Sequence, residues 1–257
     1  MTHPSARREL LATARQLNAS GLGADRSTSG NLSVRVKGGL LITPTGIPYE
    51  AMKARDLVEL GSDGAPRPGQ LFPSSEWRFH CDIYRSRPEA QAIVHAHPRF
   101  ATALACLGRS IPAFHYMVAV AGGADIRCAG YATFGSDELS RNALAALEAR
   151  RACLLANHGL IAFGETLVRA LALAIEVETL AAQYCQALQL GEPVLLDAAE
   201  MERVLEKFRS YGQQRPATVP GARPPTTARR PAGPARRPAS RRSRRPRPPG
   251  PGFGPRS

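Results

Sequence analysis

The chain has 257 residues, of which 43% are apolar, and this is enough for the core of one large domain or two small ones. No stretch approaches the roughly 18 consecutive apolar residues of a membrane span, and the first residues lack the apolar segment of a secretory signal. We therefore expect a cytoplasmic protein that does not bind membranes. Five scattered cysteines without a CxxC pair predict reduced, mostly buried thiols.

The net charge of +13 is concentrated at the C-terminal end, because residues 215–257 contain 12 Arg and 12 Pro and no acidic residue. A segment so poor in apolar residues cannot bury enough surface to offset its chain entropy. We predict a folded domain at 1–213 and a disordered Arg/Pro-rich tail at 214–257. The tail favours at most weak electrostatic contact with nucleic acid, since its single aromatic residue offers little for stacking on bases. The simpler interpretation is a dispensable extension.

Apolar spacing along the first 213 residues predicts alternating helices and strands. Helices are expected over 5–17, from about residue 74, and over 99–107, 137–150 and 165–190, with a last helix that begins near Asp197 and stops at Tyr211-Gly212. Strands are expected over 32–36, 40–43, 57–60, 92–97 and 153–156. This alternation indicates an α/β or α+β domain with a mixed sheet.

Two histidines end the apolar segment that begins at Ala92. Successive side chains of a strand point to opposite faces, so His95 and His97 share one face with their imidazoles a few Å apart. A catalytic zinc ion usually has three protein ligands and one open position. His158 follows the apolar run 152–156 in the segment Asn157-His158-Gly159 and is the candidate for the third ligand.

The segment Pro73-Ser74-Ser75-Glu76-Trp77 predicts an anion site beside an acid. A helix that begins at the serines would direct backbone N–H groups and two hydroxyls at a phosphate. Glu76 in the first turn would be close to the same ligand and is the candidate base. A divalent ion held by three neutral histidines would polarise two adjacent substrate oxygens.

Several segments in this order resemble the class II aldolase/adducin family. They are Ser29-Gly30-Asn31, Thr43-Pro44-Thr45-Gly46, Ser74-Ser75-Glu76, His95-Ala96-His97-Pro98 and Asn157-His158-Gly159. Three more are similar to its L-fuculose-phosphate aldolase branch, namely Phe114-His115-Tyr116-Met117, Tyr131-Ala132-Thr133-Phe134-Gly135 and Lys207-Phe208-Arg209-Ser210-Tyr211-Gly212. The resemblance covers about residues 5–213.

The resemblance implies a three-layer α/β/α fold around a central, mostly antiparallel sheet. It also implies a homotetramer of C4 symmetry, with one Zn²⁺ per subunit at active sites between subunits. His95, His97 and His158 would hold the zinc ion, with Glu76 as a fourth ligand in the empty site. On substrate binding, Glu76 would leave the metal and transfer protons.

The resemblance further assigns the substrate contacts. Asn31, Thr45, Gly46, Ser74 and Ser75 would bind the substrate phosphate, and Ser29 and Gly30 would line the same pocket. Tyr116 from a neighbouring subunit would be the acid/base on the aldehyde side, where Phe134 and Tyr211 would shape the pocket. Tyr116 has no sequence context of its own that marks it, and a half-buried strand tyrosine is the simpler interpretation. His80 receives no role and is expected to be a packed or exposed helix residue.

The expected function is zinc-dependent cleavage of a ketose 1-phosphate to dihydroxyacetone phosphate and a short aldehyde. Fuculose, rhamnulose and 5-deoxypentulose phosphates remain candidate substrates, because one methyl group changes binding by only about 1–3 kcal/mol. The alternatives are epimerisation, dehydration or decarboxylation on the same scaffold, and a non-catalytic adducin-like binding protein. The epimerase branch typically carries Thr-His-Ala-Asp where this chain has the segment 114–117 without an acid.

Overall fold

The computed structural model describes residues 2–22 and 29–210. Its helices are α1 (Pro4–Ala19), α2 (Trp77–Ser86), α3 (Arg99–Cys106), the 3₁₀ helix η1 (Tyr116–Ala121), α4 (Asp137–Ala146), α5 (Leu167–Leu190) and α6 (Ala198–Ser210). Its strands are β1 (Asn31–Val36), β2 (Gly39–Ile42), β3 (Val58–Gly61), β4 (Ala92–Ala96), β5 (Cys128–Ala129), β6 (Ala152–Leu155) and β7 (Gly159–Gly164).

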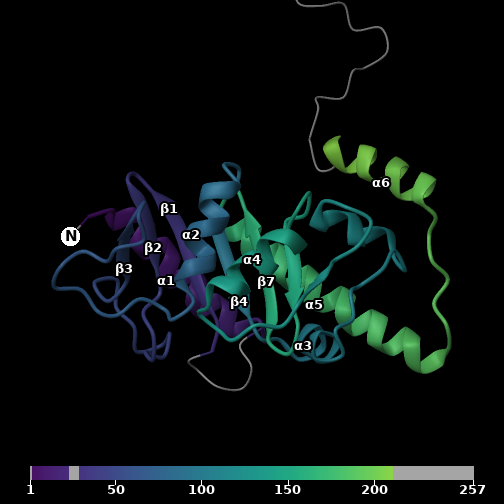
Figure 1. Cartoon of the computed structure of the whole chain (residues 1–257), viewed down its shortest axis with the longest axis horizontal. Coiled ribbons are helices and arrows are strands. Elements are labelled where there is room, and N and C mark those ends of the chain that lie inside the picture. The colour runs from purple at the N-terminus through teal and green to yellow at the C-terminus, as the bar shows by residue number, and fades with distance from the viewer. Residues whose placement is uncertain (1, 23–28, 211–257) are drawn as a thin grey trace, which may run out of the picture. The chain divides into compact units, whose positions relative to one another are not determined.

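These strands form one sheet of seven in the order β3-β2-β1-β4-β7-β6-β5. All neighbours are antiparallel except β5 and β6, which are parallel. Helices cover both faces of the sheet (Figure 1). The predicted three-layer α/β/α class with a mostly antiparallel central sheet is therefore confirmed.

Alternating side chains of β4 contribute to two separate apolar cores. Val94 faces the core that includes side chains of α1, α3 and α5, among them Leu10 of α1. Ile93 faces the other core, where Phe79 of α2 and Leu139 of α4 are buried. The side chain of His95 points to the same face of the sheet as that of Ile93. The centroid of its ring lies 5.4 Å from the centroid of the Phe79 ring. The sheet therefore directs His95 toward the helix that follows Glu76.

The register of the sheet brings distant residues beside the histidines. Asn31 at the start of β1 lies directly opposite His95 on β4, and Ile161 of β7 lies opposite His95 on the other side. Both pairs are antiparallel, so side chains of opposed residues share a face of the sheet. One end of the three central strands thus gathers the candidate site.

Several boundaries differ from the expectation. The helix α2 begins at Trp77, with Glu76 as its N-cap rather than in its first turn, and α4 ends at Ala146 rather than near Arg150. Tyr116 opens a 3₁₀ helix and not a strand. The sequence of β7 lacks the alternation of apolar and polar residues that is typical of a half-buried strand, because both faces of β7 are buried. The predicted start of the last helix is confirmed, since Asp197 Oδ1 accepts a hydrogen bond from the backbone N–H of Glu200.

None of the helices in the described part of the chain combines the length and the apolar character needed to cross a bilayer. Residues 211–257 lie outside that part, and so does the predicted end of the last helix at Tyr211-Gly212. The disordered tail, the domain boundary at residue 213 and the cytoplasmic location stay predictions.

Candidate active site

The imidazoles of His95 and His97 converge at the end of β4. His95 is fully buried, and its Nδ1 donates a hydrogen bond of 2.8 Å to the carbonyl oxygen of Leu160 on β7. In the neutral ring this leaves Nε2 with a free lone pair, and His97 Nε2 lies 2.8 Å from it. A backbone partner that fixes the tautomer in this way is typical of metal-binding histidines.

His158 enters from the turn between β6 and β7. Asn157 before it adopts a left-handed conformation with φ 54°. Gly159 after it sits where a β-carbon would lie 2.4 Å from the carbonyl oxygen of Ala96. Only glycine allows the turn to approach β4 this closely, and His158 Nε2 thereby comes within 3.2 Å of Glu76 Oε1.

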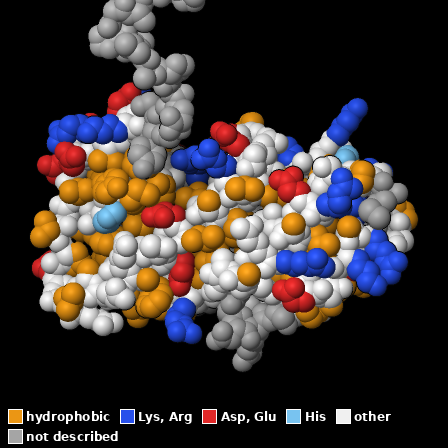
Figure 2. Space-filling model, turned by 180° about the vertical axis from the view of Figure 1, so that it is seen from behind, with side chains coloured by type: hydrophobic (Ala, Val, Ile, Leu, Met, Phe, Trp, Pro, Cys, Tyr) orange, Lys and Arg blue, Asp and Glu red, His pale blue; other side chains and the backbone are white. Residues whose placement is uncertain are grey.

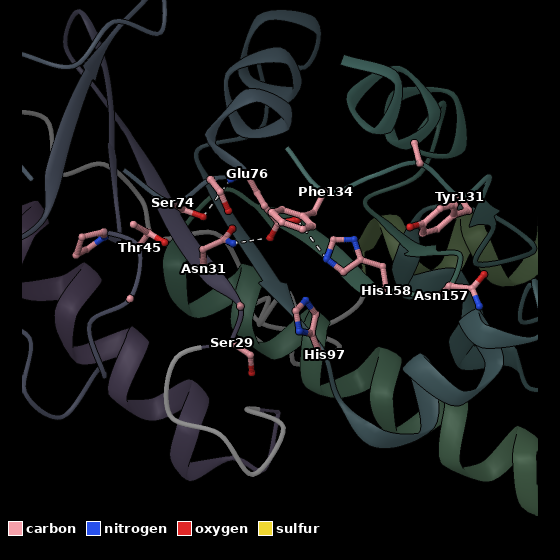
Figure 3. A pocket seen from close by; sticks show the side chains of 15 residues that line it. Ser29, Asn31, Thr45, Ser74, Glu76, His97, Tyr131, Phe134, Asn157 and His158 are labelled. Carbon is pink, nitrogen blue, oxygen red and sulfur yellow. Dashed lines mark hydrogen bonds and ion pairs between the residues drawn. The ribbon is translucent and has the colours of Figure 1, made fainter. Parts of the chain in front are cut away.

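Glu76 lies at the centre of the cluster with its side chain only 7% exposed. Its Oε2 atom lies 3.0 Å from His95 Nε2 and accepts a hydrogen bond of 2.9 Å from the amide Nδ2 of Asn31. Its Oε1 atom is buried and accepts no hydrogen bond from any described residue. Figure 3 shows Glu76 between Asn31 on one side and His158 on the other.

These four side chains fit a divalent metal ion. One ligand atom from each of Glu76, His95, His97 and His158 lies within 4.8 Å of all the others. The Nε2 atoms of His95 and His97 lie 2.8 Å apart, and the buried Oε1 of Glu76 has no hydrogen-bond partner among the described residues, so a cation would satisfy all three atoms together. Three imidazoles and a carboxylate are ligands that Zn²⁺ accepts.

The same proximity shifts the pKa values of the cluster. Burial raises the pKa of Glu76, but the imidazoles of His95 and His158 outweigh this and hold that pKa well below its ordinary value. Burial lowers the pKa of His95, but the Glu76 carboxylate outweighs burial and raises it. Burial, followed by the neighbouring His95 and His158, lowers the pKa of His97 to about 3. Glu76 is therefore ionised and His97 neutral at pH 7, as metal ligands must be.

A pocket of about 370 Å³ opens beside the cluster (Figure 3). Its lining contains most of the residues predicted from the sequence, namely Ser29, Gly30, Asn31, Thr45, Gly46, Ser74, Ser75, Glu76, His97, Phe134 and His158. His95 belongs to the cluster but lies behind this lining. Segments from six separate parts of the sequence thus form one pocket.

Tyr116 is a predicted site residue that this pocket does not include. Tyr116 is 50% exposed and does not line it; the Tyr116 ring instead packs near Phe208 of α6, with 6.4 Å between centroids. Tyr211 lies outside the described residues. Conversely, Tyr131 and Asn157 line the pocket and were given no role from the sequence, although each stands within three residues of a predicted site residue.

Comparison with known proteins identifies the family. The family model described as Class II Aldolase and Adducin N-terminal domain matches residues 8–185. A Rhodospirillum rubrum protein named 5-methylthioribulose-1-phosphate/5-deoxyribulose-1-phosphate aldolase is 56% identical over 216 residues, which cover 84% of this chain and 96% of that protein. L-fuculose phosphate aldolase from Escherichia coli is 51% identical over 197 residues, which cover 76% of this chain and 91% of that protein.

Solved structures agree with these relatives. A structure titled L-fuculose 1-phosphate aldolase superposes with a TM-score of 0.77 at 44% identity, covering 81% of this chain and 98% of the other. Because the family model spans most of the folded residues and both relatives exceed half identity, the chain belongs to the class II aldolase and adducin family and is a lyase related to fuculose-phosphate aldolase.

Proposed function

We propose that this protein is a Zn²⁺-dependent aldolase that cleaves a ketose 1-phosphate to dihydroxyacetone phosphate and a short aldehyde. The observation that carries this proposal is the pocket, in which a polar recess adjoins the cluster of three histidines and Glu76. A ligand with a phosphate at one end and vicinal oxygens at the other would occupy both. The intact cluster disfavours a non-catalytic binding protein, which has no use for it.

In this proposal the phosphate is held by neutral donors. Asn31, Thr45, Gly46, Ser74 and Ser75 line one part of the pocket, and the described lining residues include no Lys or Arg. The N-terminus of α2 follows directly; no side-chain hydrogen bond caps it, and the positive end of the helix dipole favours an anion. Hydroxyl, amide and backbone donors therefore replace a cationic side chain.

The chemistry is simplest to follow in the direction of synthesis. The Glu76 carboxylate removes a proton from carbon 3 of dihydroxyacetone phosphate, and carbon 3 then attacks the aldehyde carbon to form the new bond. The hydroxyl of Tyr116 donates a proton to the oxygen that was the aldehyde carbonyl, and cleavage is the reverse. A divalent ion bound by the cluster supplies a Lewis acid for the charge that develops on the oxygens of carbons 2 and 3. Asn31 keeps the Glu76 carboxylate oriented through its hydrogen bond to Oε2.

The role of Tyr116 requires a second subunit, and we propose a homotetramer with active sites shared between neighbours. In support, Tyr116 lies outside the pocket of its own chain and is half exposed. Apolar side chains of Leu190, Val194 and Leu195 are also exposed, and Leu196 beside them hydrogen-bonds the carbonyl of Ala113 near Tyr116. Figure 2 shows apolar side chains gathered on one face of the molecule.

The two relatives are named for different sugar phosphates. The Rhodospirillum rubrum relative is named for methylthioribulose and deoxyribulose phosphates, whereas the Escherichia coli relative is named for fuculose phosphate, at 56% and 51% identity respectively. We propose that this chain accepts a ketose 1-phosphate of one of these types. Phe134 and Tyr131, both exposed at the pocket, would contact the group beyond carbon 4.

A panel assay tests the proposal. Zinc-loaded protein is incubated with the 1-phosphates of fuculose, rhamnulose, 5-deoxyribulose and methylthioribulose, and dihydroxyacetone phosphate is measured with a coupled dehydrogenase. Release from at least one sugar that stops on chelation is the expected result. Conversion of a sugar phosphate without release of dihydroxyacetone phosphate would instead favour an epimerase or dehydratase and refute the aldolase.

A further inference from the structure

A chain of buried hydrogen bonds runs from the base of the site into the core. Its members are Glu76, Asn31, His80, Ser33 and Tyr84, contributed by α2, its N-cap and β1. His80 Nε2 lies 2.6 Å from Asn31 Oδ1, and His80 Nδ1 lies 2.7 Å from Ser33 Oγ. Ser33 Oγ also lies 2.9 Å from the hydroxyl of Tyr84.

The direction of every bond in this chain follows from its first member. An ionised carboxylate only accepts hydrogen bonds, so Asn31 must present its NH₂ group to Glu76 and its oxygen to His80. His80 Nε2 must then donate. In a neutral imidazole Nδ1 therefore accepts from Ser33, and Ser33 in turn accepts from Tyr84. Only one arrangement satisfies all five groups.

The burial of these groups favours that arrangement. His80 and Ser33 are fully buried, and burial lowers the pKa of His80 to about 3, so the ring is neutral at pH 7. Burial raises the pKa of Tyr84, which keeps its hydroxyl protonated as a donor. A buried amide or imidazole facing the wrong way would leave a donor or acceptor unpaired in a dry environment.

We propose that His80 is a positioning residue of the active site: through Asn31 it fixes one amide orientation that serves both Glu76 and the phosphate end of the pocket. The Asn31 amide has a second N–H, and the side chain lines the pocket beside Glu76 and Ser74 (Figure 3). If the amide turned over, its oxygen would face the Glu76 carboxylate and its N–H groups would leave the pocket. This inference rests on the proposed function only for the roles of Glu76 and Asn31.

Two variants of His80 separate positioning from packing. In His80→Gln the amide nitrogen of the new side chain takes the place of Nε2 and still donates to Asn31. In His80→Asn the shorter side chain reaches Ser33 but not Asn31. Both remove the same ring from the core and differ in size by one methylene group, whereas only the second removes the donor to Asn31. The unfolding midpoint reports the difference in packing.

The measurements are made without turnover, on full-length protein. Zinc affinity is measured by competition with a chelator, and binding of inorganic phosphate to the zinc-loaded protein by calorimetry, beside the thermal unfolding midpoint. We expect His80→Gln to stay within about threefold of the natural protein and His80→Asn to lose roughly 10- to 100-fold in phosphate or zinc affinity. Equal affinities in the two variants, whatever their unfolding midpoints, would overturn the inference.

Ser33→Ala decides the question if the His80 variants do not fold. It removes one oxygen atom and frees His80 to adopt the other tautomer, which no longer donates to Asn31. We expect phosphate affinity to fall severalfold and the unfolding midpoint to fall as well, because His80 Nδ1 and the Tyr84 hydroxyl lose a buried partner. Unchanged phosphate affinity in folded Ser33→Ala would overturn the proposal. If these tests succeed while no sugar phosphate is cleaved, the proposed reaction fails and the positioning role of His80 stands.

Discussion

Replacing Gly159 by alanine tests how closely the turn carrying His158 must approach the end of β4, which His97 follows directly. The added β-carbon would lie 2.4 Å from the carbonyl oxygen of Ala96 and 2.7 Å from Cδ2 of His97. Each neighbour would have to retreat by about 0.7–1 Å to reach ordinary contact. Metal–ligand distances tolerate only about 0.2 Å. We therefore expect zinc affinity to fall ~10- to 100-fold, or about 1.4–2.7 kcal/mol.

The assay is competition for zinc between the full-length variant and a coloured chelator, with Gly108→Ala as the matched control. Gly108 has φ +62°, and a β-carbon there would meet no atom within 4 Å. Its substitution should lower stability by about 1–2 kcal/mol through backbone strain and leave zinc affinity unchanged. If folded Gly159→Ala bound zinc as tightly as the natural protein does, the view that this close approach positions the metal ligands would be refuted.

Three further predictions concern the charges of the site. Glu76→Gln retains the volume and the hydrogen bond from Asn31 but removes the base, so aldolase turnover at saturating zinc should fall about 10²- to 10⁴-fold, as steady-state kinetics would show. Adding 100 Kd of free zinc to the metal-free protein should raise the free energy of unfolding by about 2.7 kcal/mol, measured by urea titration; an unchanged midpoint would contradict a site in the native fold. His80 is neutral in the folded protein, where its pKa is about 3, and binds a proton in the unfolded chain below about pH 6.5. The free energy of unfolding should therefore fall as the pH drops below about 6.5. Its slope should exceed that of His80→Gln by an amount that approaches about 1.4 kcal/mol per pH unit. Parallel pH–stability curves for the two proteins would refute that contribution.

The sequence was most informative where local periodicity alone sets geometry. The two-residue spacing of His95 and His97 places both rings on one face of any strand, and the structure brings their Nε2 atoms to 2.8 Å. His158 was predicted because an apolar strand ends just before it. For the phosphate end, the adjacent serines indicated an anion site, but Asn31 and Thr45 came only from the family resemblance.

The parts that escaped prediction depend on contacts between distant segments. His80 looked like an ordinary helix residue, since its partners Asn31 and Ser33 lie 49 and 47 residues earlier and reach it through the sheet. The strand β7 lacks alternation because it is buried on both faces. Tyr116 was expected in a strand, but it begins a 3₁₀ helix whose N-cap is His115. Tertiary packing, which local patterns do not encode, decided each of these.

The central claim is that Glu76 moves a proton at carbon 3 of dihydroxyacetone phosphate, and hydrogen exchange tests it most directly. Zinc-loaded protein is incubated in D₂O with dihydroxyacetone phosphate alone, and the methylene protons of carbon 3 are followed by NMR. This experiment needs no knowledge of the aldehyde. The account predicts that the carbon 3 methylene signal falls to half its intensity with the natural protein, and that it does not change after chelation or in Glu76→Gln. Absence of exchange with the zinc-loaded natural protein, or undiminished exchange in Glu76→Gln, would contradict it.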